Sequence, residues 1–146
     1  MRTRALALTI LGLALAPPAR ADYAGVTPGH PPPKKNDGPK ATLTWVGFQA
    51  EGRTPRVFVQ LSSSGSFDQK LVGRDLVVNL PGYHVDTKNN TRPLKTEDFG
   101  TDVLRVVARP TKTGVELRVH FKGPARQAKL RSADESDGWS YLYLDF

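Results

Sequence analysis

The residues that could carry out catalysis or bind a metal ion are few and scattered in this chain of 146 residues. Its three histidines, His30, His84 and His120, lack the helical or short-strand spacing that would bring them to one metal ion. The serines at 62–66 surround a glycine in a segment typical of a hairpin turn, and the sequence contains no G-x-S-x-G. A glycine-rich loop that opens a helix and holds phosphate is also missing. The sequence therefore predicts a protein that is not an enzyme, with no metal site and no cofactor.

Two further features narrow the chemistry. Residues 134–138 (DESDG) superficially resemble a calcium-binding loop. They lack its ligand spacing and its distal glutamate, so we expect a solvated acidic turn before the last strand. The sequence contains no cysteine, which excludes disulfides, thiolate metal sites and cysteine nucleophiles.

The first 21 residues have the three parts of a secretion signal. Arg2 and Arg4 precede an apolar run at 5–16, prolines follow, and small residues lead to Ala21. This is the pattern of a signal peptide, which we expect to be cleaved after Ala21. The largely apolar run at 5–16 has 12 residues, fewer than the roughly 20 needed to cross a bilayer. We therefore expect no transmembrane segment after cleavage.

Removal of this signal changes the charge of the protein. Without Arg2, Arg4 and Arg20, 18 of the 21 basic residues remain against 14 acidic ones, a net charge of +4 instead of +7. A mildly basic exported protein is expected to meet the anionic groups of a cell envelope, and not nucleic acid.

Residues 22–40 (DYAGVTPGHPPPKKNDGPK) contain five prolines and three glycines and little that could be buried. Such a composition predicts a disordered linker with polyproline II character. The linker is either a tether that extends the reach of the following domain or a spacer without function. His30 lies within it, and we assign it no role.

From residue 41 onward, apolar and polar side chains alternate, as they do in strands with one buried face. The pattern predicts about eight strands, at 42–49, 56–62, 66–71, 75–80, 103–109, 115–121, 126–132 and 139–146. Short strands at regular spacing indicate an all-β fold, an antiparallel sandwich or barrel. The long connection at 81–102 contains the one helical candidate, at 96–99. Its Leu94 and Phe99 are expected to cap one end of the core.

The order of these strands resembles an AMIN domain over residues 43–146. Two similar halves each contain a strand after a turn (PRVFVQL, VELRVHF), a strand of mixed polarity (FDQKLV, RQAKLRS) and a closing strand (DLVVNLPG, WSYLYLDF). The resemblance implies an antiparallel β-sandwich of two small sheets. It also implies a periplasmic localisation module of the kind that binds peptidoglycan in cell-wall amidases and type IV pilus secretins. The chain has Asn79 where the family usually has Asp, so the resemblance assigns no carboxylate role at that position.

The hydrophobic pattern of the hairpin at 103–121 predicts its register. If Pro110 faces Val115, the apolar residues at 104, 106 and 108 lie beside those at 117, 119 and 121. A slip of one residue would place Arg105 in the core, where a charge without a partner is very costly. The same register sets Arg109 opposite Glu116 as an exposed cross-strand pair.

This register gathers basic side chains on the outer face of the hairpin. Arg105 lies opposite His120, Arg105 and Arg118 have no evident partner, and Lys122 extends the same face. Such guanidinium groups can pair bidentately with the carboxylates of a peptide.

The last strand predicts an aromatic stripe. If the apolar residues at 142, 144 and 146 point inward, Trp139, Tyr141 and Tyr143 point to the other face, where flat rings can stack on sugars. The alternative is that these rings cover a sheet or a loop and that the arginines are ordinary surface residues. The candidate ligand-binding residues are Arg105, Arg118, His120, Lys122, Trp139, Tyr141 and Tyr143.

We therefore expect a non-catalytic periplasmic module that binds peptidoglycan and localises itself or a partner at the cell wall. The alternative is a protein-interaction subunit of an envelope machine, such as an accessory of a type IV pilus secretin. Its partner would then be an envelope protein such as a secretin or an amidase.

Overall fold

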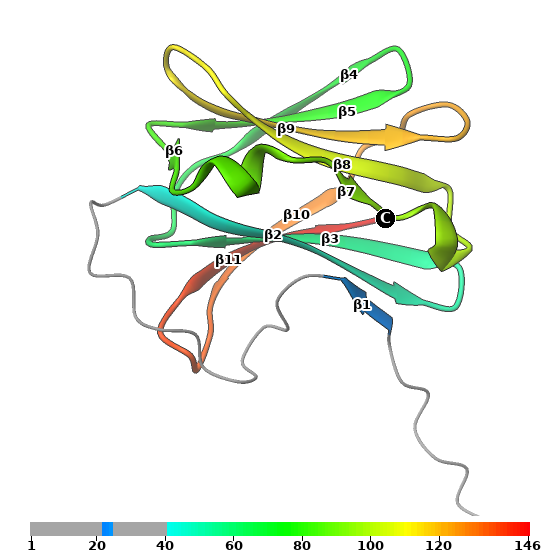
Figure 1. Cartoon of the computed structure of the whole chain (residues 1–146), viewed down its shortest axis with the longest axis horizontal. Coiled ribbons are helices and arrows are strands. Elements are labelled where there is room, and N and C mark those ends of the chain that lie inside the picture. Colours follow the sequence, from blue (N-terminus) through cyan, green and yellow to red (C-terminus); the bar gives the residue numbers. More distant parts are fainter. Residues whose placement is uncertain (1–21, 25–40) are drawn as a thin grey trace, which may run out of the picture.

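The computed structural model describes residues 22–24 and 41–146 of the chain. These residues form two β-sheets that stack as layers, so the all-β sandwich is confirmed (Figure 1). The predicted signal peptide and its cleavage site lie outside the described residues. Within the part of the chain that the structure describes, no helix has the length and apolar character needed to span a membrane.

The first sheet has the strand order β1-β2-β3-β11-β10, and β6 pairs with the beginning of β2. Neighbouring strands are antiparallel, except for the parallel pair of β2 and β6. The strands are β1 (Asp22–Ala24), β2 (Thr42–Glu51), β3 (Thr54–Leu61), β6 (His84–Val85), β10 (Lys129–Asp134) and β11 (Ser140–Asp145).

The second sheet has the order β4-β5-β9-β8-β7 and is antiparallel throughout. Its strands are β4 (Asp68–Val72), β5 (Asp75–Pro81), β7 (Leu94–Lys95), β8 (Val103–Pro110) and β9 (Gly114–Phe121). The eight predicted strands are therefore all present, and the described residues add three short ones, β1, β6 and β7. The observed β4 and β10 begin two and three residues later than predicted.

The core lies between the two sheets and follows from the period-two pattern. On β3, Val57, Val59 and Leu61 are fully buried, and they meet inward-facing residues of β5 and β9 such as Leu76 and Leu117. Burial of each such side chain contributes about 1.5–3 kcal/mol. Because the chain has no cysteine, this apolar layer is its main source of stability.

The connection from β5 to β8 runs along one side of the sandwich (Figure 1). It contains β6, β7 and two 3₁₀ helices, η1 (Lys88–Thr91) and η2 (Glu97–Phe99). Thr96 is fully buried, and its hydroxyl donates to the carbonyl of Val103 at 2.7 Å. The predicted helical segment at 96–99 corresponds to η2. Leu94 and Phe99 pack against the core as predicted.

Two register shifts correct the predicted strand geometry. One separates Val103 from Arg105 on β8, so Val103 and not Leu104 lies opposite Phe121. Val103 is fully buried, whereas Leu104 is only half-buried. The prediction that Leu104 faces Phe121 is wrong because an extra residue in a bulge reverses which side chain points inward. The other shift lies between Leu43 and Trp45 on β2.

The first three residues of the predicted linker are among the described residues. Residues 22–24 form β1 and pair with β2, with Asp22 opposite Ala50 and Ala24 opposite Phe48. Strand β2 offers an unpaired edge there, which accepts backbone hydrogen bonds from a segment of almost any composition. The rest of the predicted linker, residues 25–40, lies outside the described residues.

Candidate functional site

The outer face of the second sheet brings together three strands that carry charge. Along β9, His120 lies between Asp75 of β5 and Arg105 of β8. Two residues further back, Arg118 lies between Val77 and Val107. The predicted pairing of Arg105 with His120 is confirmed. The sequence prediction did not include Asp75, because the order of the strands was not known.

A third row of residues completes this outer face. Glu116 lies between Asn79 of β5 and Arg109 of β8, so the predicted register of the hairpin is confirmed at this position. Three rows of outward-facing side chains thus cross the sheet.

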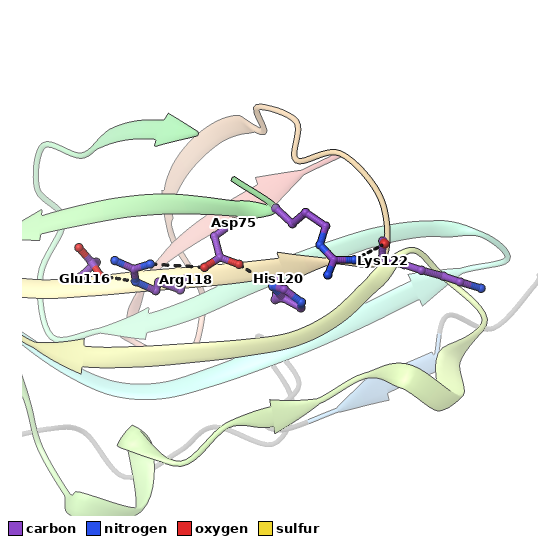
Figure 2. Close-up of polar contacts among 6 residues, drawn as sticks. Asp75, Glu116, Arg118, His120 and Lys122 are labelled. Atoms are coloured by element: carbon purple, nitrogen blue, oxygen red, sulfur yellow. Dashed lines mark hydrogen bonds and ion pairs between the residues drawn. The ribbon is translucent and has the colours of Figure 1, made fainter. Parts of the chain in front are cut away.

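An ion-pair network joins four of these side chains (Figure 2). His120 Nδ1 lies 2.6 Å from Asp75 Oδ1, so this ring nitrogen donates to the carboxylate. Arg118 donates from Nε to Glu116 Oε1 at 2.5 Å and from Nη1 to Asp75 Oδ2 at 3.4 Å. The prediction that Arg118 has no partner is therefore wrong. Glu116 is its neighbour two positions along the same face of β9, and Asp75 approaches from β5.

The network favours the charged forms of Asp75 and Arg118. Burial disfavours the ionised form of Asp75, but hydrogen bonds and charges from His120 and Arg118 outweigh it and hold the pKa of Asp75 below its ordinary value. The hydrogen bond to Glu116 raises the pKa of Arg118 despite partial desolvation. Both groups are therefore ionised at neutral pH and largely neutralise one another.

A groove of about 330 Å³ lies beside this network. Residues of three kinds line it: Val107 and Ala108 of β8, Thr91 and Pro93 of the connection, and the basic side chains Arg105, Arg109, Arg118 and His120. This volume is near the lower end of the roughly 300–1,000 Å³ typical of small-molecule sites. The groove thus has the size of a pocket for part of a ligand.

Two arginines of the groove are free to bind an anion. Arg105 and Arg109 are both exposed, and neither makes an ion pair with any residue that the structure describes. The predicted contact of Arg109 with Glu116 is not formed, because Glu116 bonds to Arg118 on its own strand. Among the described groove residues, these two guanidinium groups are the unneutralised positive charges.

Lys122 does not belong to the groove. It follows β9 and is exposed, and Figure 2 shows its side chain extending away from His120. Its backbone carbonyl accepts a hydrogen bond from Arg74 Nη1 at 3.2 Å. The expectation that Lys122 extends the binding face is therefore not supported by its position.

The three predicted aromatic residues lie on the outer face of the first sheet, on the opposite side of the sandwich from the groove. Trp139, Tyr141 and Tyr143 form a cluster with Phe58 of β3 and are at most 5% exposed. The rings of Tyr141 and Tyr143 are stacked, with centroids 6.0 Å apart. They therefore do not join the arginines in one site. The expectation of a stripe available for stacking on sugars is corrected to a second packed cluster.

The acidic turn at 134–138 explains part of this burial. Tyr141 donates its hydroxyl to Asp137 Oδ2 at 2.7 Å, and Tyr143 donates to Glu135 Oε1 at 2.6 Å. Burial, followed by these carboxylate contacts, raises the pKa of both tyrosines. The turn is thus bonded to the aromatic cluster and is not merely solvated. No group of three potential metal ligands occurs among the described residues.

Comparison with known protein families shows which family this chain belongs to. Residues 46–141 match the family model of the AMIN domain, which is most of the chain. The chain belongs to the AMIN domain family. AMIN domains are non-catalytic modules that target peptidoglycan and typically occur in exported proteins. No curated protein and no solved structure matches this AMIN domain significantly.

The candidate ligand-binding residues chosen from the sequence did not include Arg109, which was expected to pair with Glu116, nor the groove residues Asp75, Thr91 and Pro93. The sequence could have placed Asp75 on the outer face, because it begins a strand in which Asp75, Val77 and Asn79 alternate with the core residues. Thr91 and Pro93 had no such signal, because only the path of the long connection brings them beside β8.

Proposed function

We propose that this AMIN domain is an exported, non-catalytic module that binds peptidoglycan at the groove of the second sheet. It thereby localises itself or a partner at the cell wall in the periplasm. Membership of the family supports peptidoglycan as the target. The pattern of residues 1–21 supports export by a signal peptide.

The observation that carries the proposal is the pair of unneutralised guanidinium groups, Arg105 and Arg109. Peptidoglycan is a glycan with short peptides that end in carboxylates, and guanidinium groups bind carboxylates through two parallel hydrogen bonds. The two residues are four positions apart on β8, which corresponds to about 13 Å along a strand. This spacing suits two carboxylates of one stem peptide, or of two adjacent ones, better than a single small anion.

His120 and Arg118 have a supporting role in this proposal. Asp75 occupies Nδ1 of His120, which leaves Nε2 without a hydrogen-bond partner among the described residues. Nε2 is therefore able to bond to a peptide group beside a carboxylate held by Arg105. Arg118 is restrained by Glu116 and Asp75, so it forms a fixed wall of the groove.

Cosedimentation of the purified protein with purified sacculi at low salt tests the proposal. Arg105→Ala should weaken binding by about 1.5–3 kcal/mol, the usual value of a hydrogen bond to a charged group, which is roughly a 10- to 150-fold loss of affinity. Arg105→Lys should recover only part of this loss, because an ammonium cannot make the planar paired contact.

Arg53→Ala is the matched control. Arg53 is an exposed arginine in the turn between β2 and β3 of the first sheet and makes no ion pair with a described residue. Its removal lowers the net charge by the same amount but leaves the groove intact. Equal losses for Arg105→Ala and Arg53→Ala would show nonspecific attraction, and a protein that stays in the supernatant would contradict the proposed function.

The edge strand β4 favours a second candidate function, interaction with an envelope protein such as a secretin or an amidase. β4 ends its sheet, and Leu71 and Val72 at its tip are 47% and 46% exposed. An exposed edge with apolar side chains is able to accept a strand from a partner. Recovery of one stoichiometric envelope protein, with no retention on sacculi, would favour this candidate over glycan binding.

A further inference from the structure

A second groove, beside Trp45, has no role in the contacts described so far. Trp45 is 41% exposed and, among residues 41–146, is the one aromatic side chain exposed to this degree. The register shift after Leu43 sets it on β2 between the stretches that pair with β6 and with β1. No described strand pairs with the edge of β2 at Trp45, and Trp45 lines a groove there.

The helix η1 forms the other wall of this groove. Asn90 donates from its side-chain amide to the carbonyl of Thr44 at 2.5 Å and so holds η1 against the edge of β2. Asn89 and Arg92 line the groove beside Trp45, and it has a volume of about 170 Å³. Both side chains are exposed, and neither has a hydrogen-bond or ion-pair partner among the described residues.

We propose that the groove of Trp45, Asn89 and Arg92 binds a sugar ring of the glycan strand. The indole offers a flat apolar surface to the apolar face of a pyranose ring. The amide of Asn89 both donates and accepts hydrogen bonds, as needed to bind hydroxyl and N-acetyl groups, and Arg92 adds donors. This inference rests on the proposed function, because it assigns the saccharide part of the same ligand.

The position of the groove supports one continuous ligand. Pro93 lines both this groove and the groove of Arg105 and Arg109. A glycan strand over Trp45 can therefore place its stem peptide across Pro93 and toward the two arginines. A protein partner is less suited to this site, since stable protein contacts bury about 1,200–2,000 Å² and this groove has a volume of only about 170 Å³.

Intrinsic fluorescence tests the inference without any substitution. The chain has two tryptophans, and Trp139 is only 5% exposed, so acrylamide should quench chiefly Trp45. The probe is soluble, peptide-free glycan released from sacculi by an amidase. We expect saturating glycan to lower the quenching constant about twofold or more, since a bound ring covers the indole. An unchanged quenching constant at a glycan concentration that saturates binding would overturn the inference.

Substitutions give an independent test. Trp45→Ala should weaken binding of the peptide-free glycan about tenfold, whereas Arg53→Ala, which removes an exposed side chain from the turn between β2 and β3, should retain wild-type affinity. Arg105→Ala should weaken binding to intact sacculi more than binding to peptide-free glycan.

The outcomes separate the two proposals. If Trp45→Ala binds both probes as the wild type does while Arg105→Ala loses sacculi, the saccharide site is wrong and the proposed function stands. If the wild type binds neither probe, both are wrong. If Trp45→Ala binds both probes normally but no longer binds an envelope protein that the wild type captures, the groove is a protein contact and the saccharide assignment is overturned.

Discussion

Tyr141→Ala tests whether the aromatic cluster of the first sheet is a packed structure or a ligand surface. Tyr141 is fully buried, its ring centroid is 6.3 Å from that of Phe58, and it stacks on Tyr143. Truncation of a buried aromatic ring typically costs about 3–5 kcal/mol, because apolar burial is lost and a cavity remains. That is a large part of the roughly 5–15 kcal/mol by which such domains are stable.

A second substitution separates the ring from its hydroxyl. The hydroxyl of Tyr141 accepts from Gln60 Nε2 at 2.8 Å and donates to Asp137 Oδ2 at 2.7 Å. Tyr141→Phe keeps the ring but removes both bonds, so we expect a smaller loss of about 1–3 kcal/mol. Tyr143→Phe removes the single bond to Glu135 and should cost less than Tyr141→Phe.

Urea unfolding at neutral pH measures these losses as a shift of the midpoint at constant slope. Sacculus binding of the folded Tyr141→Phe protein should equal that of the wild type, because the ring stays in place and the groove of Arg105 and Arg109 lies on the opposite side of the sandwich. An unchanged unfolding midpoint for Tyr141→Ala, together with lost binding to sacculi, would refute the burial of this face and restore it as a ligand surface.

Two further predictions concern stability. Gly47→Ala should destabilise the domain by about 1–3 kcal/mol in urea unfolding, because the added Cβ would lie 2.2 Å from Phe58 Cζ. Gly123→Ala is the control: its added Cβ would have no atom within 4 Å, so its stability should stay within about 0.5 kcal/mol of the wild type. The pKa of Asp75 is lowered in the folded state. Its contribution to the free energy of unfolding is therefore complete above its ordinary pKa of 3.8 and is lost as the pH falls through its pKa in the folded state. The difference in unfolding free energy between the wild type and Asp75→Asn should therefore shrink as pH falls below about 4, and a difference that stays constant with pH would contradict the ion pair with His120.

The hairpin of β8 and β9 shows what the sequence alone can predict. Side chains on a strand alternate strictly between two faces, so one burial pattern fixes the register. The predicted pairs at Ala108–Leu117 and Pro110–Val115 are confirmed. The prediction is wrong at the start of β8 because Val103 and Leu104 are both apolar there. Either one is suited to the core, and the pattern cannot indicate a bulge.

Ion pairs depend on more than register. Arg109 and Glu116 do lie opposite each other, yet Glu116 bonds to Arg118 of its own strand. A long charged side chain can reach several neighbours on one face of a sheet and bonds to only some of them. The choice here depends on Asp75, which anchors the other side of the Arg118 guanidinium and comes from a strand that the hairpin pattern does not include.

The position of the acidic side chains explains why a mildly basic domain carries a localised cationic groove. On the first sheet, Glu135 accepts from a buried tyrosine hydroxyl, so its charge is held at the aromatic cluster. On the second sheet, Glu116 and Asp75 are bonded to Arg118 and His120. The acids nearest the groove are thus already paired with Arg118 and His120. Because these acids are not available to Arg105 and Arg109, the two arginines remain unneutralised. The unneutralised positive charge of the groove follows from this placement of carboxylates more than from net charge.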